Sequence, residues 1–125
     1  MQENTLRQNV LTMLKPLGLP PQRVTTRYVA EALLLYGHGG NYTRLLGKAL
    51  YPVIAARFGV TPAAIEKGIR VAVQQIQKQP TAAFRARFDF WHGQRITSAR
   101  FLDVMGAAIR EKWAAQGLAL KPLDK

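Results

Sequence analysis

Cysteine is missing from this 125-residue sequence, and so is any long hydrophobic run. The first absence excludes disulfides, thiolate metal ligands and cysteine nucleophiles. The second excludes a membrane-spanning helix, which needs about 18 consecutive apolar residues. The N-terminal Met-Gln-Glu-Asn also lacks the basic and then apolar segments of a signal peptide. We therefore predict a single domain over residues 1–125 that lies in the cytoplasm and has no membrane partner.

Acidic residues are scarce as well. The chain has 7 Asp and Glu against 18 Lys and Arg, so its net charge is +11. The excess is concentrated between Arg44 and Arg100, where only Glu66 and Asp89 oppose the cations. Such a surplus favours a polyanionic partner. A membrane surface would also attract it, but the apolar residues recur at helical spacing, as a core requires, so we favour nucleic acid.

The histidines and carboxylates are not spaced as a catalytic or metal site requires. His38 and His92 fall in separate predicted loops, and neither has an acidic residue at a ligand spacing. The remaining carboxylates are scattered, so no acid and base form a pair. We therefore predict no enzymatic activity, no metal site and no cofactor.

The segment from Tyr51 to Lys78 has the pattern of a helix-turn-helix. Pro52 suits the first position of a helix, where its missing N–H is harmless, and Gly59 suits the left-handed residue that ends one. Thr61 and Pro62 then resemble the N-cap and first turn of a second, longer helix. A short helix, a turn containing glycine and a longer helix predict a helix-turn-helix over about residues 52–78.

The second of these helices is amphipathic. Its apolar stripe, predicted to face the core, consists of Ile65, Ile69, Ala72, Val73 and Ile76. The opposite face carries Ala63, Lys67, Arg70, Val71, Gln74 and Lys78, with Glu66 on its flank. Long donors on one side of a helix could read bases in a major groove. The same pattern also describes an ordinary solvated face, and the wheel alone leaves both interpretations open.

The rest of the chain predicts further helices and no strand pair. We expect one helix over Thr5–Leu14 and another that is capped by Thr25 or Thr26 and ends at Tyr36. A third is expected over Tyr42–Leu50, and Thr97 or Ser98 is expected to cap the last, long helix. The glycine-rich 37–41 segment is predicted to be a turn, because it lacks the strand and Lys-Ser/Thr of a phosphate-binding loop. The fold class is therefore all-α, a single domain forming a bundle of about six helices, with a flexible tail over about 117–125.

Two of these segments allow more than one interpretation. In the 42–50 helix, Leu45, Leu46, Ala49 and Leu50 are predicted to face inward. Arg44 and Lys48 then lie outside at i,i+4, where two cations repel unless a phosphate bridges them, although plain surfaces carry such pairs too. The aromatic and basic 81–90 segment could stack on unpaired bases. The spacing of Phe84 and Phe88 favours core filling instead.

Several of these residues together resemble a known family. The run Lys-Ala-Leu-Tyr-Pro-Val-Ile-Ala-Ala-Arg-Phe over 48–58 is similar to a segment of the C-terminal DNA-binding effector domain of the sporulation master regulator, stage zero sporulation protein A. The similarity continues through Thr61, Ile65, Glu66, Lys67, Ile69, Arg70 and Ala72, and reaches Thr97, Phe101 and Arg110. The resemblance implies a bundle of six helices that binds a TGNCGAA-type element through a helix-turn-helix.

The resemblance also suggests roles for individual positions. Glu66 matches a glutamate, and Lys67 and Arg70 match arginines, of the family's recognition helix. Ala64 and Val71 depart from the family, which has an arginine and a histidine there, so the target sequence does not carry over unchanged. The predicted base contacts are Glu66, Lys67, Arg70 and Gln74. The predicted DNA backbone contacts are Arg44, Lys48, Arg57, Thr61, Lys78 and Arg95.

Three functions remain open at this point. The first is a sequence-specific double-stranded DNA-binding transcription regulator, without the receiver domain of the family because the first helix begins close to Met1. The second is a protein-interaction module that pairs with a full-length relative through the last helix and blocks or tunes it. The last helix could also join two copies of this domain as a homodimer on tandem DNA sites. The third is a non-specific nucleic-acid binder that relies on charge alone. The first function depends on Lys67 and Arg70 individually, the second on the exposed surface of the helix predicted over 97–113, and the third only on the summed positive charge.

Overall fold

The computed structural model describes residues 2–37, 45–89 and 93–117, and these residues form helices and connecting turns without a strand. The elements are α1 (Gln2–Leu14), a 3-10 turn η1 (Lys15–Leu17), α2 (Val24–Tyr36), a π-helical turn η3 (Leu46–Leu50), α3 (Tyr51–Phe58), α4 (Pro62–Lys78), α5 (Ala82–Arg87) and α6 (Ser98–Ala115). The predicted all-α fold is confirmed.

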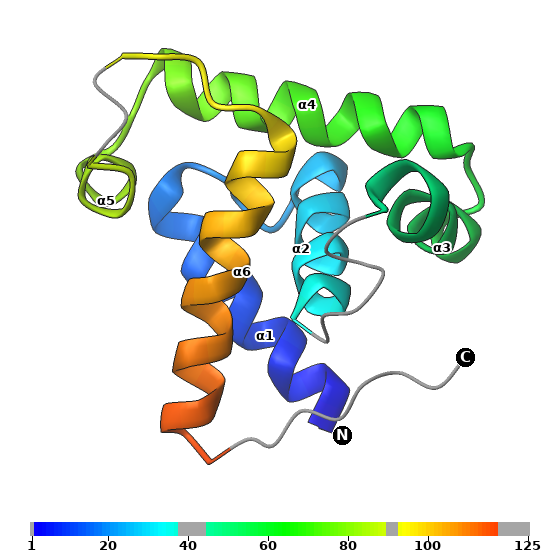
Figure 1. Ribbon diagram of the computed structural model, residues 1–125, viewed down its shortest axis with the longest axis horizontal. Helices are drawn as coiled ribbons and strands as arrows, with labels where there is room; N and C mark the ends of the chain where they lie inside the picture. The colour runs from blue at the N-terminus through cyan, green and yellow to red at the C-terminus, as the bar shows by residue number, and fades with distance from the viewer. Residues whose placement is uncertain (1, 38–44, 90–92, 118–125) are drawn as a thin grey trace.

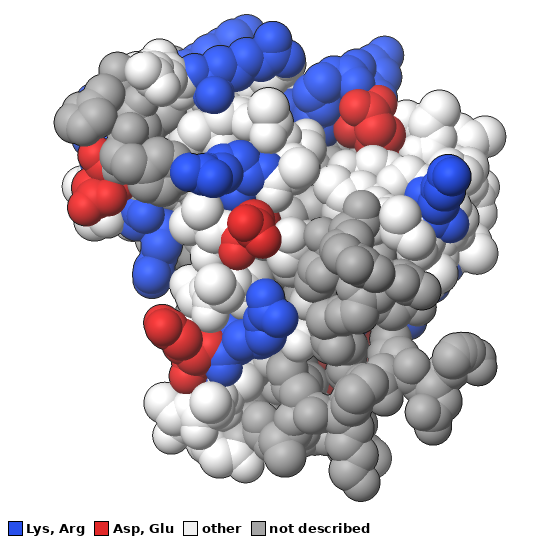
Figure 2. Space-filling model, viewed as in Figure 1, with Lys and Arg blue, Asp and Glu red and all other residues white. Residues whose placement is uncertain are grey.

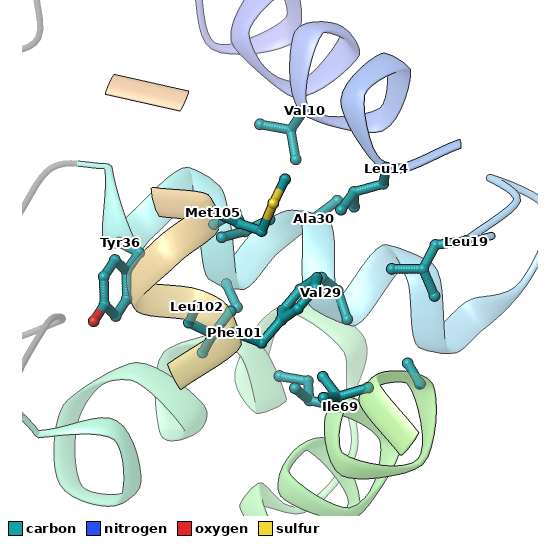
Figure 3. Packing of buried hydrophobic residues seen from close by; sticks show 14 of the residues in the cluster. Val10, Leu14, Leu19, Val29, Ala30, Tyr36, Ile69, Phe101, Leu102 and Met105 are labelled. Atoms are coloured by element: carbon teal, nitrogen blue, oxygen red, sulfur yellow. The ribbon is translucent and has the colours of Figure 1, made fainter. Parts of the chain in front are cut away.

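Helix α2 forms the centre of the bundle. It contacts α1, α3, α4 and α6, and every residue of it from Val29 to Tyr36 is buried. Figure 1 shows α4 lying across one end of the molecule, with α2 and α6 running away from it. Side chains of α1, α2, α4 and α6 turn toward a common interior (Figure 3), among them Val10, Leu14, Val29, Ile69, Phe101, Leu102 and Met105. The core thus fixes α4 on top of a three-helix base.

The predicted helix-turn-helix is present as α3, a short turn and α4. Gly59 ends α3 with a φ of 67°, in the left-handed region that suits glycine. Thr61 caps α4, its Oγ1 accepting a hydrogen bond from the Ala64 amide at 3.1 Å, and Pro62 occupies the first turn. The predicted apolar stripe is buried at all five positions, Ile65, Ile69, Ala72, Val73 and Ile76. The predicted phase of this helix is therefore confirmed.

Other boundaries differ from the prediction. Helix α2 begins at Val24 with Arg23 as its N-cap and no side-chain cap bond, so neither Thr25 nor Thr26 caps it. Thr26 is buried within the first turn. Leu45 is 41% exposed, so its predicted inward orientation is wrong. The predicted 42–50 helix is, within the described residues, the π-helical turn η3, which runs into α3 without a break.

Aromatic side chains fill the part of the core between α5 and the start of α6. Phe84 and Phe88 are buried, and the centroids of their stacked rings lie 4.8 Å apart. The ring centroid of Phe88 lies 5.6 Å from that of Phe101 on α6. Core filling is therefore the role of Phe84 and Phe88, as the sequence favoured. Thr97 caps α6 through a 3.1 Å bond from the Arg100 amide. Trp113, near the end of α6, is completely buried.

Some predictions fall on residues that the structure does not describe. These are the 38–41 part of the glycine-rich turn, the first residues of the predicted 42–50 helix, and the tail beyond residue 117. Among the helices that are described, none combines the length and apolar character needed to cross a bilayer.

Candidate nucleic-acid interface

The surface of α4 that points away from the bundle carries polar and basic side chains. We call this the outward face of α4, and it consists of Ala63, Lys67, Val71, Gln74 and Lys78. Lys67 and Lys78 are exposed and Gln74 is partly exposed. Figure 2 shows Lys and Arg side chains gathered along the edge of the molecule where α4 runs, with an acidic group beside them. An α-helix with long donors on its free side has the shape and chemistry that a major groove accepts.

Arg70 and Glu66 form an ion pair on the flank of this face. Arg70 Nη1 donates to both carboxylate oxygens of Glu66, at 2.6 and 2.7 Å. The two side chains are 41% and 46% exposed, so water still reaches both. The pair holds the guanidinium next to the outward face, where its remaining N–H groups can donate to an acceptor.

A hollow of about 330 Å³ lies beside the same flank, between α4, η3 and the start of α6. Arg70 and Arg95 line it together with Tyr51, Leu46 and Ile96. Burial, followed by the charge of nearby Glu66, raises the pKa of Tyr51. The phenol is protonated at neutral pH, as tyrosine ordinarily is, and it can donate a hydrogen bond. The structure brings Arg70 and Arg95 to one hollow, although they are far apart in sequence.

The residues predicted to contact the DNA backbone differ in their surroundings. Lys48, Lys78 and Arg95 are exposed on η3, on the last turn of α4 and before α6. Thr61 Oγ1 accepts a bond from an amide, which leaves its hydroxyl hydrogen able to donate to a phosphate oxygen. Arg44 lies outside the described residues. Contact with DNA stays a prediction for each of these positions.

Arg57 has a different environment from the other predicted backbone contacts. Its Nη1 lies 2.7 Å from Glu31 Oε1 and 3.7 Å from Glu3 Oε2. Glu31 is buried on α2, so Arg57 is directed at the scaffold of the bundle. A DNA contact by Arg57 would compete with this ion pair.

One basic residue beside α4 was not singled out from the sequence. Arg23 is exposed at the start of α2, and its Nη1 donates to Gln75 Oε1 on α4 at 3.1 Å. Gln75 lies about 140° around the helix from Arg70, so Arg23 adds a cation on the other flank. No local signal predicts this, because the two partners are 52 residues apart in the chain.

The described residues contain no group of three or more His, Asp or Glu side chains that could hold a metal ion. Cations lie on both flanks of α4, with Arg70 and Arg95 on one side and Arg23 on the other. Such a basic edge favours an anion-rich partner.

Comparison with protein families matches residues 10–105 to the family described as the C terminal of the sporulation initiation factor Spo0A. The matched region runs from the second half of α1 into α6 and includes the whole helix-turn-helix. A comparison with curated proteins found no match. Because the family match covers most of the chain, this protein belongs to the Spo0A C-terminal family of DNA-binding sporulation regulator domains.

Proposed function

We propose that this domain binds double-stranded DNA sequence-specifically and regulates transcription, with the outward face of α4 in the major groove. The observation that carries the proposal is the position of Lys67 and Gln74. Both project from a helix whose other side is anchored in the core by a buried stripe. Such a helix can present side chains to base edges in a fixed orientation.

The ion pair on the flank gives a second element of recognition. Arg70 is held by Glu66 next to the outward face, and both residues were predicted to contact bases. Arg offers two donors in one plane, which matches O6 and N7 of guanine, whereas Glu66 can accept from the amino group of cytosine. We propose that these two residues read adjacent base pairs.

Cations around the outward face supply the contacts that do not depend on sequence. Lys48 on η3, Lys78 in the last turn of α4 and Arg95 before α6 have exposed side chains, and we propose that they bind phosphates. Their neutralisation of DNA releases counterions and makes binding sensitive to salt. A location in the cytoplasm stays a prediction.

Pairing through α6 would require apolar surface on this helix that the core of one monomer does not use. Trp113 is completely buried within the monomer, so it leaves no apolar surface at that position for a partner. Homodimerisation on tandem sites, and pairing with a full-length relative, therefore stay predictions without a specific structural observation behind them.

Selection of bound fragments from random duplex DNA tests the proposal. We expect an enriched sequence that binds at least about 100-fold more tightly than a scrambled duplex of the same length and composition. About five phosphate contacts would give a log-log salt slope of −4 to −5. A steep slope without an enriched sequence would favour the charge-only binder, and a flat titration would leave the protein-interaction module.

A further inference from the structure

A buried carboxylate lies at the junction of three helices. Glu31, in the middle of α2, is only 7% exposed. Its Oε1 accepts a hydrogen bond from Arg57 Nη1 of α3 at 2.7 Å and another from Arg7 Nη2 of α1 at 3.3 Å. Its Oε2 accepts from Arg7 Nε. A carboxylate in such surroundings is stable as an anion only while cations satisfy it, so Glu31 holds α1 and α3 to α2.

Glu31, Arg7, Arg57 and Glu3 together form the Glu31 cluster, and the other interactions within it agree with this role. The hydrogen bond to Glu31 is the main reason why the pKa of Arg7 is raised, although burial opposes the shift. Glu3, which is exposed, lies 3.2 Å from Arg7 and 3.7 Å from Arg57. The four side chains carry two positive and two negative charges, so the cluster contributes nothing to the net positive charge that attracts DNA.

The same side of α2 also contacts α4. Tyr28, one turn before Glu31, packs edge-on against Phe58 of α3 at 4.9 Å. A Cβ atom on Gly68 of α4 would lie 2.7 Å from Tyr28 Cδ2, so the absence of a side chain there lets the two helices approach closely. Two neighbouring turns of α2 thus contact both helices of the helix-turn-helix.

We infer that Glu31 is a positioning residue for DNA binding, which holds α3 through Arg57 and thereby fixes the direction in which α4 presents its outward face. Arg57 then serves the scaffold and does not bind a phosphate. This inference rests on the proposed function, because it requires that the direction of α4 matters for sequence recognition.

Glu31→Gln separates the two roles of Arg57 by the sign of the effect. If Arg57 binds a phosphate, removal of the competing anion frees the guanidinium, and affinity for all DNA rises. If Glu31 positions α3, loss of its charge lets α3 shift and misaligns the base contacts. We expect the ratio of selected-site to scrambled-duplex affinity to fall about tenfold, the value of roughly one base contact. Affinity for the scrambled duplex should stay within about threefold.

The control is Glu3→Gln, which makes the same chemical change in the same cluster at an exposed carboxylate that is 58% accessible. It should leave the affinity ratio unchanged. All proteins are compared at a temperature where circular dichroism shows full helicity, so that a loss of folded protein does not lower the ratio. An unchanged ratio in folded Glu31→Gln, or a rise in affinity for both duplexes, would overturn the inference.

Arg57→Ala gives an independent readout if Glu31→Gln does not fold. Positioning predicts a lower affinity ratio with the salt slope of the wild type. A phosphate contact predicts an unchanged ratio and a slope shallower by about one unit, which would overturn the inference. A wild-type protein that fails to discriminate the two duplexes would instead contradict the proposed function itself.

Discussion

The Glu31 cluster and the Glu66–Arg70 pair have similar contact distances and different surroundings. Arg57 Nη1 lies 2.7 Å from Glu31, and Arg70 Nη1 lies 2.6 Å from Glu66. The Glu31 side chain is 9% exposed, whereas that of Glu66 is 46% exposed. Water screens the exposed pair, which leaves its groups able to exchange partners, but it does not reach most of the buried one. Burial of the carboxylate partner, more than the contact distance, therefore distinguishes Arg57 from Arg70.

The largest expected effect comes from Glu31→Ala. This change leaves Arg7 and Arg57 without their buried partner, so we expect the free energy of unfolding to fall by about 2–3 kcal/mol. The value is below that of fully buried pairs because both arginine side chains are partly exposed. Urea unfolding followed by circular dichroism would measure it.

Glu66→Ala is the matched control in the exposed pair. It should lower the free energy of unfolding by only about 0.3 kcal/mol, as i,i+4 pairs on helix surfaces do. Equal losses for Glu31→Ala and Glu66→Ala would contradict the assignment of one cluster to the scaffold and the other to the interface.

An effect smaller than that of Glu31→Ala and larger than that of Glu66→Ala is expected at the contact between α2 and α4. Gly68→Ala introduces a Cβ that would lie 2.7 Å from Tyr28 Cδ2, so the helices must separate or the ring must move. We expect a loss of about 1–2 kcal/mol in the free energy of unfolding, despite the better helix propensity of alanine. Gly47→Ala in η3 is the control, because nothing lies within 4 Å of its added Cβ. Stabilisation by Gly68→Ala in thermal unfolding would show that the approach of α2 to α4 is not constrained there.

Local signals explain which parts of the fold could be predicted. Gly59, Thr61 and the apolar spacing from Ile65 onward act within a few residues of chain, and each was found where predicted. The start of α2 was not predicted correctly because no side chain caps it. The inward orientation predicted for Leu45 was wrong because η3 departs from α-helical periodicity. Patterns based on 3.6 residues per turn do not place side chains in a π-helical turn.

The candidate site was predictable only where it depends on one helix. The wheel placed Lys67 and Gln74 opposite the core from the sequence of α4 alone. It could not show that Arg57 pairs with Glu31, which is 26 residues away, or that Arg23 joins the flank of α4. A basic residue near a helix-turn-helix is the same in sequence whether it meets a phosphate or a buried carboxylate, so only tertiary packing distinguishes the two.

The most direct test of the account compares Lys67→Ala and Arg70→Ala with Lys48→Ala on the selected site and on a scrambled duplex. If the outward face and flank of α4 read bases, the first two lower affinity for the selected site by roughly 10- to 100-fold and leave the scrambled duplex within a few-fold. Lys48→Ala should weaken both duplexes in parallel and make the salt slope shallower by about one unit. Equal weakening of both duplexes by all three variants would contradict sequence reading by α4.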